Sequence, residues 1–305
     1  MKTSSLTFRP GTSADSYTVF TIFERSLADL AQRFGSAVQT SAADPQALQR
    51  MWEERRSLYE HLAHTSEHFW LVEREGEAVA FARSILRDSL LQLTEMFVLP
   101  GEQSGGIGSG LMAHVFPKDE RIKHRSIIAS ADSRAQALYL KAGVYPRFPL
   151  YYFGGAPERV SITSDLAIEP FQNSPGNLAI LSKIDKAVLR FKREIDHTWF
   201  LSERSGYLYY RDGQPVGYGY LGVRSGPFAL LEMEDFPAVL AHAENQAAIE
   251  GRHEFGVEVP MVNTAAVDYL LERGFRMDVF LALVMNDEPV AKFENYIVTS
   301  PPFFL

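Results

Sequence analysis

The stretch that most constrains the fold is the glycine-rich sequence VLPGEQSGGIGSGL at residues 98–111. An apolar run, residues 90–99, precedes it, and residues 109–116 show a helical pattern. Glycines let backbone N–H groups approach a phosphate closely, and the N-terminus of a helix carries about half a positive charge. The order of strand, glycine-rich loop and helix start therefore predicts a site for a phosphate-bearing cofactor.

Two well-known phosphate loops do not fit this stretch. A P-loop requires lysine and then serine or threonine after its second glycine, whereas Gly108 is followed by serine and glycine. A dinucleotide-binding fingerprint that begins at Gly106 requires a third glycine where Leu111 stands. The pattern that fits is Gln-x-x-Gly-x-Gly, beginning at Gln103. Taken alone, it is also compatible with an ordinary glycine-rich turn between a strand and a helix.

A second motif, DSRAQALYLKAGV, follows at residues 132–144. Asp132 is a suitable N-cap for a helix here, and a glycine stands at the C-cap. Together, the two motifs resemble the GNAT superfamily of acyl-CoA-dependent N-acyltransferases, whose pattern here is Asn-x-x-Ala-x-x-Leu-Tyr-x-x-x-Gly-Phe. Four positions match in register, namely Ala135, Leu138, Tyr139 and Gly143. Asp132 replaces the asparagine of the pattern and Val144 replaces its phenylalanine.

The resemblance implies that acetyl-CoA is the co-substrate and that the loop binds its pyrophosphate. The cofactor-binding residues that it implies are Phe97, Val98, Gln103, Ser104, Gly105, Gly106, Ile107, Gly108, Ser109 and Asp132. Among them, Phe97 or Val98 would use a backbone N–H to polarise the thioester carbonyl. Many family members carry arginine or lysine in the loop, where this chain has Ser104 and Gly105. Backbone donors and the helix end would therefore bind the phosphates.

Two residues are predicted to be catalytic. Tyr139 matches the tyrosine that in the family lies near the CoA sulfur and acts as general acid. The alternative is an aromatic residue that packs on the core with its hydroxyl in water. Glu95 lies on the strand before the loop and could accept the proton of the amine, directly or through water. The alternative for Glu95 is a carboxylate held by a neighbouring strand or helix, and Asp132 is a third candidate base.

The pattern of residues 132–144 returns at residues 263–275 as NTAAVDYLLERGF. Hairpin-like segments also recur, at residues 73–81 and 210–218. An internal repeat of about half the chain explains both observations. We predict an α/β (α+β) protein of two GNAT-like domains, residues 1–157 and 158–305, each a mixed, mostly antiparallel sheet flanked by helices.

The two halves differ where the cofactor would bind. The second half has no glycine loop in residues 230–238, and its acidic residues Glu232, Glu234 and Asp235 would repel phosphates. Leu270 stands where the first half has Tyr139. We therefore expect the first domain to bind acyl-CoA and the second to be degenerate, with a structural or substrate-shaping role.

Composition narrows the choice of partner and compartment. The formal net charge of −8 disfavours nucleic acid and mildly favours cationic amines. Cysteine is absent, which excludes a cysteine acyl-enzyme and favours direct transfer. No apolar run approaches the ~18 residues of a membrane span, so a cytoplasmic protein is expected. His61, His64 and His68 better fit a solvated helix end than a metal site, and no metal is expected.

These observations predict an acetyl-CoA-dependent N-acetyltransferase that acts on a primary amine of a small molecule by direct attack. A non-catalytic acyl-CoA-binding sensor or scaffold is the alternative. A homodimer is compatible with the sequence. The sequence does not identify the amine, the length of the acyl chain, or any ligand of the second domain.

Overall fold

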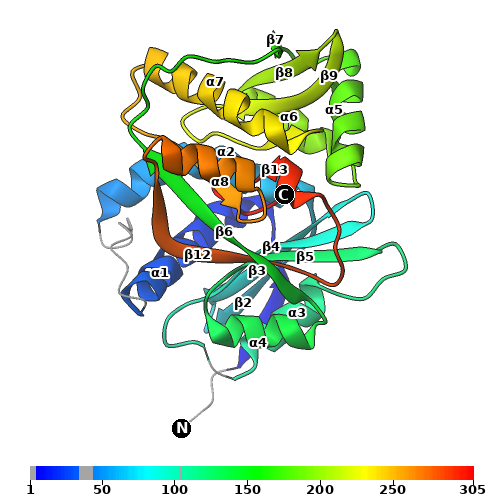
Figure 1. The fold of residues 1–305 in the computed structure, drawn as a ribbon. Helices are drawn as coiled ribbons and strands as arrows, with labels where there is room; N and C mark the ends of the chain where they lie inside the picture. The colour runs from blue at the N-terminus through cyan, green and yellow to red at the C-terminus, as the bar shows by residue number, and fades with distance from the viewer. Residues whose placement is uncertain (1–4, 34–43, 104) are drawn as a thin grey trace. The chain divides into compact units, whose positions relative to one another are not determined.

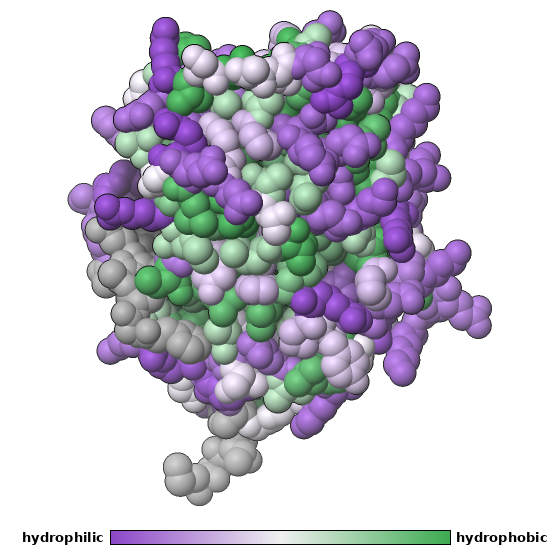
Figure 2. All heavy atoms as spheres, viewed as in Figure 1, coloured by the Kyte–Doolittle hydropathy of each residue, from purple (hydrophilic) through white to green (hydrophobic). Residues whose placement is uncertain are grey.

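The computed structural model describes residues 5–33, 44–103 and 105–305. The chain divides into two compact units, Met1–Tyr145 and Pro146–Leu305. Hydrophilic residues dominate the face seen in Figure 2, with smaller hydrophobic areas between them. In the part of the chain that is described, no helix is both long and apolar enough to cross a membrane.

The first unit is built on a sheet with the strand order β1-β2-β3-β4-β5 (Figure 1). Its strands are β1 (Leu6–Pro10), β2 (Ser66–Arg74), β3 (Glu77–Arg87), β4 (Leu90–Val98) and β5 (His124–Ser130). The strands pair antiparallel except for β4 and β5, which are parallel. This is the mixed, mostly antiparallel sheet that the sequence predicts.

Helices cover both faces of this sheet. They are α1 (Ser16–Arg33), α2 (Pro45–Thr65), α3 (Ile107–Val115) and α4 (Ser133–Lys141). Phe69 and Trp70 are adjacent on β2 and point to opposite faces of the sheet, because successive side chains of a strand point in opposite directions. The Trp70 ring stacks on His114 of α3, with 3.9 Å between the centroids. The ring of Phe69 instead lies under the guanidinium of Arg83, which also contacts Tyr59 of α2.

The second unit repeats the same order of elements. Its helices are α5 (Pro175–Val188), α6 (Glu194–Glu203), α7 (Phe236–Ile249) and α8 (Thr264–Glu272). One group of strands has the order β13-β10-β9-β8-β7, and another has the order β12-β6-β11. Their bounds are β6 (Tyr145–Gly155), β7 (Ala167–Phe171), β8 (Ser205–Arg211), β9 (Gln214–Leu221), β10 (Phe228–Leu230), β11 (Phe255–Pro260), β12 (Arg276–Asn286) and β13 (Tyr296–Ile297).

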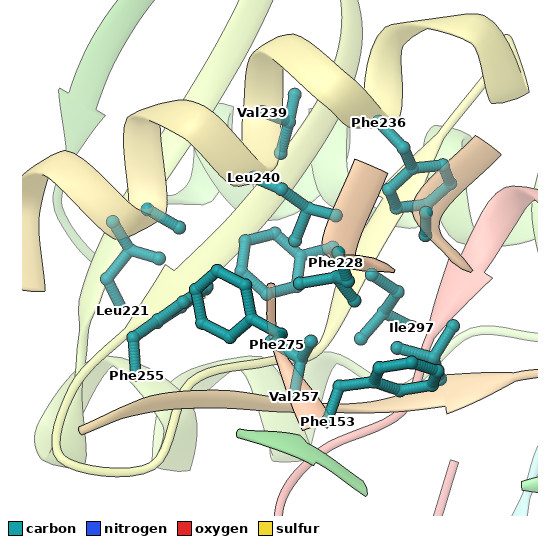
Figure 3. Packing of buried hydrophobic residues seen from close by; sticks show 14 of the residues in the cluster. Phe153, Leu221, Phe228, Phe236, Val239, Leu240, Phe255, Val257, Phe275 and Ile297 are labelled. Atoms are coloured by element: carbon teal, nitrogen blue, oxygen red, sulfur yellow. The ribbon is translucent and has the colours of Figure 1, made fainter. Parts of the chain in front are cut away.

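The core of the second unit lies between α7 and these strands (Figure 3). Phe236 and Leu240 come from α7, Phe228 from β10 and Val257 from β11, and all four side chains are fully buried. Ile297 of β13 belongs to the same cluster. Residues from β6 and from most elements between β8 and β13 therefore share one hydrophobic core.

The units divide twelve residues before the boundary predicted at 157. The reason is β6, all of which lies before residue 157. It pairs antiparallel with β11 over Leu150–Gly155, and Phe153 is opposite Val257. Phe153 is also part of the core of the second unit. The predicted boundary at 157 therefore lies just after a strand of that unit.

Candidate active site in the first unit

The parallel pairing of β4 with β5 stops halfway along β4. It joins Leu90–Leu93 to His124–Ile127 and ends there, although β4 continues to Val98. Residues 95–98 stay paired with β3 on the other side. The two strands therefore separate, and the β4 edge that faces away from β3 is left open at its C-terminal end.

A β-bulge sets which backbone groups point into this opening. The register between β3 and β4 jumps from Arg83 opposite Glu95 to Ser84 opposite Leu93, so Thr94 is the extra residue. Beyond the bulge, the Leu99 N–H donates to the Val79 carbonyl at 2.9 Å.

Because the direction of backbone groups alternates along a strand, the peptide groups of Phe97 also face β3, as those of Leu99 do. Those of Met96 and Val98 face the opening. The Val98 carbonyl accepts hydrogen bonds from Ser26 Oγ at 3.4 Å and from Gln103 Nε2 at 3.3 Å, which agrees with this direction. Of the two predicted N–H donors, Val98 is the one aimed at the opening. Phe97 contributes its ring, which packs edge-on against Phe23 at 5.0 Å.

The glycine-rich loop follows directly and leads into α3. Gly105 and Gly106 have φ angles of +81° and +82°, a backbone conformation that residues with a side chain rarely adopt. Gly106 is the N-cap, and α3 begins at Ile107. The first N–H groups of a helix have no acceptor within the helix, so those of Ile107, Gly108 and Ser109 are available to an anion. Ser104 lies outside the described residues.

An arginine of α4 lies beside the loop, and the sequence motifs alone do not predict this contact. Arg134 Nη1 donates to Gln103 Oε1 at 2.8 Å, and Arg134 also forms an ion pair with Asp132. Arg33 of α1 binds the same carboxylate at 3.1 Å. Partial burial raises the pKa of Asp132, but the hydrogen bonds from these two arginines outweigh it and lower the pKa to about 2. Asp132 is therefore an anion that anchors two guanidinium groups beside the loop.

Asp132 also performs the predicted capping role. Its side chain accepts a hydrogen bond from the Arg134 N–H at 2.9 Å and caps α4. Because its oxygens already bind Arg134 and Arg33 and its pKa is lowered, the Asp132 carboxylate is a poor base and has a structural role. Arg134, two positions after Asp132, places a positive charge beside Gln103 of the loop.

Tyr139 lies on α4 with only 5% of its surface exposed. Burial, and to a lesser extent the negative charge of Asp132, raises the pKa of its phenol. The hydroxyl therefore stays protonated at neutral pH, which a general acid requires.

Glu95 forms a completely buried ion pair with Arg83. Arg83 Nε donates to Glu95 Oε2 at 2.7 Å, and neither side chain is exposed. Burial raises the pKa of Glu95 although Arg83 opposes this rise. The second carboxylate oxygen, Oε1, has no hydrogen-bond partner among the described residues. The structure therefore holds Glu95 in place by one oxygen and leaves the other oxygen unused.

A second buried carboxylate lies on α1. Glu24 is 2% exposed and accepts a hydrogen bond from Arg55 Nη1 of α2 at 3.2 Å. Aromatic rings from the same helices lie nearby, with Phe23 within 5.9 Å of the Arg55 guanidinium. Aromatic rings and two carboxylate–arginine pairs thus pack between α1, α2 and the sheet.

Residues 65–144 match the family model described as an acetyltransferase (GNAT) domain. This segment of the first unit is similar to a GNAT domain. The matched segment includes the open edge of β4, the glycine loop and Tyr139. A search of the curated proteins finds no significant match.

Solved structures with the same fold extend the likeness to nearly the whole chain. A candidate acetyltransferase from Pyrococcus horikoshii has a TM-score of 0.73 at 16% identity, over 97% of this chain and 94% of its own. A GCN5-related N-acetyltransferase from Sphaerobacter thermophilus has a TM-score of 0.58 at 16% identity, over 92% and 95%. A tandem GNAT protein from the clavulanic acid biosynthesis pathway has a TM-score of 0.55 at 14% identity, over 93% and 99%. The chain therefore has the fold of these proteins over nearly its whole length.

The second GNAT-like unit lacks the features of the first. After β10 the chain enters a short 3-10 helix, Met233–Asp235, and then α7, with no glycine between them. Asn263, the counterpart of Asp132, caps α8 by accepting a hydrogen bond from the Ala266 N–H. Leu270, the counterpart of Tyr139, is fully buried.

Proposed function

We propose that the protein is an N-acetyltransferase that moves an acetyl group from acetyl-CoA to a primary amine of a small molecule, with the reaction in the first unit. The observation that carries this proposal is the open edge of β4, which leads into a glycine loop and a helix N-terminus. An extended amide-containing chain can pair with such an edge while its phosphates bind the loop. The residues present therefore fit acyl-CoA as a co-substrate.

Each predicted residue would have a distinct role in this reaction. The N–H groups at the start of α3 would bind the pyrophosphate, and Arg134 would add the positive charge that the loop lacks. The Val98 N–H would donate to the thioester carbonyl oxygen, which becomes more negative as the amine attacks. Tyr139 would give its proton to the departing thiolate as the carbon–sulfur bond breaks.

The attacking amine must also lose a proton. Glu95 could take it through Oε1, because burial raises its pKa and Arg83 occupies only the other oxygen. Its complete burial means that a water molecule or a movement of α1 or α2 must connect it to the amine. The same burial supports a structural role, and variants of Glu95 must therefore be tested for stability as well as turnover.

Calorimetric titration of acetyl-CoA tests the proposal most directly. Wild-type protein should bind, and a Gly106→Glu, Gly108→Glu variant should not, because its carboxylates would fill and repel the phosphate site. Gly76→Glu is the matched control, since Gly76 also has a positive φ and open space around it. Absence of binding by the wild type would overturn the proposal.

Turnover then separates the enzyme from the non-catalytic alternative. A panel of small amines, with release of free thiol as readout, should identify at least one acceptor. Protein that binds acetyl-CoA and releases no thiol with any amine would be an acyl-CoA sensor.

A further inference from the structure

The C-terminal segment of the chain lies where the second unit would otherwise have an open strand edge. By order along the chain, β10 corresponds to β4 and β11 to β5. In the second unit, β10 does not pair with β11. It pairs with β13, where Phe228 is opposite Ile297 and Ala229 opposite Tyr296. Val298 then continues to β11, and its N–H donates to the Glu258 carbonyl at 3.1 Å.

Side chains on both sides hold this segment. Asn295 Nδ2 donates to the carbonyls of Leu230 and Leu231, each at 2.9 Å, at the end of β10. Asn263 uses its Oδ1 to cap α8 and its Nδ2 to reach the Tyr296 carbonyl at 3.3 Å. The residue that caps α8 thus also donates a hydrogen bond to a backbone carbonyl of the C-terminal segment.

Burial makes the segment part of the core. Tyr296, Ile297 and Val298 have no exposed surface, and Ile297 packs in the cluster with Phe228 (Figure 3). Further along, the Phe304 ring stacks on Phe200 of α6, with 5.7 Å between the centroids and 10° between the planes. The apolar C-terminus therefore packs on the second unit itself.

We propose that residues 293–305 act as a permanently bound peptide ligand at the edge of β10. This edge is the position in the second unit that corresponds to the acyl-CoA site proposed at β4 of the first unit. The backbone of this segment supplies to β10 the pairing that the amides of an acyl-pantetheine arm would supply to β4 in the first unit. The second unit is therefore closed to acyl-CoA by its own chain, and the protein takes up one acyl-CoA. The uptake of one acyl-CoA rests on the proposed function of the first unit, whereas the occupation of the β10 edge by residues 293–305 does not.

A peptide that binds as a ligand should stay bound after the chain is cut. A recognition site for a specific protease is inserted between Glu288 and Pro289, both at the exposed turn after β12. After cleavage of the folded full-length protein, the C-terminal fragment should co-elute with the remainder in gel filtration. Ile297→Asp should release it, because a charge would enter the buried cluster.

Asn295→Ala tests the two hydrogen bonds to the end of β10. Since the loss of both would weaken the complex, release should be roughly tenfold faster or more. Glu294→Ala is the matched control on the same segment, because Glu294 is exposed, and it should change nothing. Dissociation of the wild-type fragment immediately on cleavage, or equal retention of the three variants, would overturn the proposal.

Calorimetry on the same proteins keeps the two proposals apart. Uncleaved protein should bind one equivalent of acetyl-CoA, and Gly106→Glu should abolish that binding without releasing the fragment. A retained fragment with no acetyl-CoA binding would refute the function of the first unit alone. A second equivalent bound by uncleaved wild type would refute the closure of the second unit.

Discussion

The buried pair of Arg83 and Glu95 gives the sharpest quantitative prediction for the first unit. Arg83→Met keeps much of the side-chain volume among the rings of Tyr59 and Phe69 but removes the charge that Glu95 faces. Neither charged side chain has any exposed surface, so water cannot take the place of the guanidinium. Breaking a buried ion pair on one side costs about 3–5 kcal/mol. For a unit of this size, that loss corresponds to a fall in melting temperature of roughly 6–20 °C.

The pH dependence of the variant supplies an independent check. Burial raises the pKa of folded Glu95, and Arg83 opposes this rise. Where the folded-state pKa is raised, the folded state binds the proton more tightly, so stability falls as pH rises from the unfolded pKa of 4.5 through the folded value. Arg83→Met removes the opposing charge, and its stability deficit should therefore be smallest at acidic pH and grow toward neutral pH.

Calorimetric melting, with hydrogen exchange resolved on β3 and β4, assigns the effect to the first unit. Arg56→Met is the control, because Arg56 is exposed and its pair with Glu60 lies on the surface of α2. That control should change stability by no more than about 0.5 kcal/mol. The double variant Arg83→Met, Glu95→Leu should recover most of the loss, since no charge is then left buried. A single variant as stable as the control at pH 7 would refute the assignment of an isolated, dry ion pair.

Further predictions concern turnover, cofactor affinity and the second unit. Tyr139→Phe should lower turnover by roughly 10²–10⁴ while the Kd for acetyl-CoA is kept, measured by thiol release and calorimetry; an unchanged turnover would refute the general-acid role. Arg134→Gln should weaken acetyl-CoA binding about tenfold and flatten its salt dependence, whereas Arg121→Gln, a distant exposed arginine, should not. Burial raises the pKa of Glu258 to about 8, so wild-type stability should fall as pH rises from 4.5 to 8. Glu258→Gln should remove that dependence in thermal melts, and an identical pH profile would contradict it.

Local motifs in the sequence predict the local structure around the glycine loop of the first unit well. The glycine loop, the N-cap Asp132 and the helix that carries Tyr139 are each encoded within a few adjacent residues, so their conformations follow from local rules. The repeat of the elements also follows from the sequence, because strand and helix periodicities recur in the same order.

Other features depend on contacts that no local pattern encodes. The bulge at Thr94 decides that Val98, and not Phe97, faces the opening, and a single extra residue leaves no distinct signal in an apolar strand. Arg83 follows the apolar run 78–82 on β3, and only its buried partner on β4 reveals its role. Arg134 reaches the loop through space. A sequence signal was available there, since an arginine adjacent to a helix cap is well placed to face an anion.

The two units differ most in how they satisfy the same structural need. When two neighbouring strands separate, the backbone N–H and C=O groups along the separated edge need partners, and leaving them buried without any is costly. In the first unit, the glycine loop and the start of α3 make the edge of β4 a place where a phosphate-bearing ligand can complete the pairing. In the second unit, acidic residues stand at the corresponding positions, and residues 296–298 complete the pairing of β10 and β11. We therefore propose that the absence of the loop and the pairing of the C-terminal segment with β10 belong together, and restoring glycines after β10 alone should not create a second acyl-CoA site.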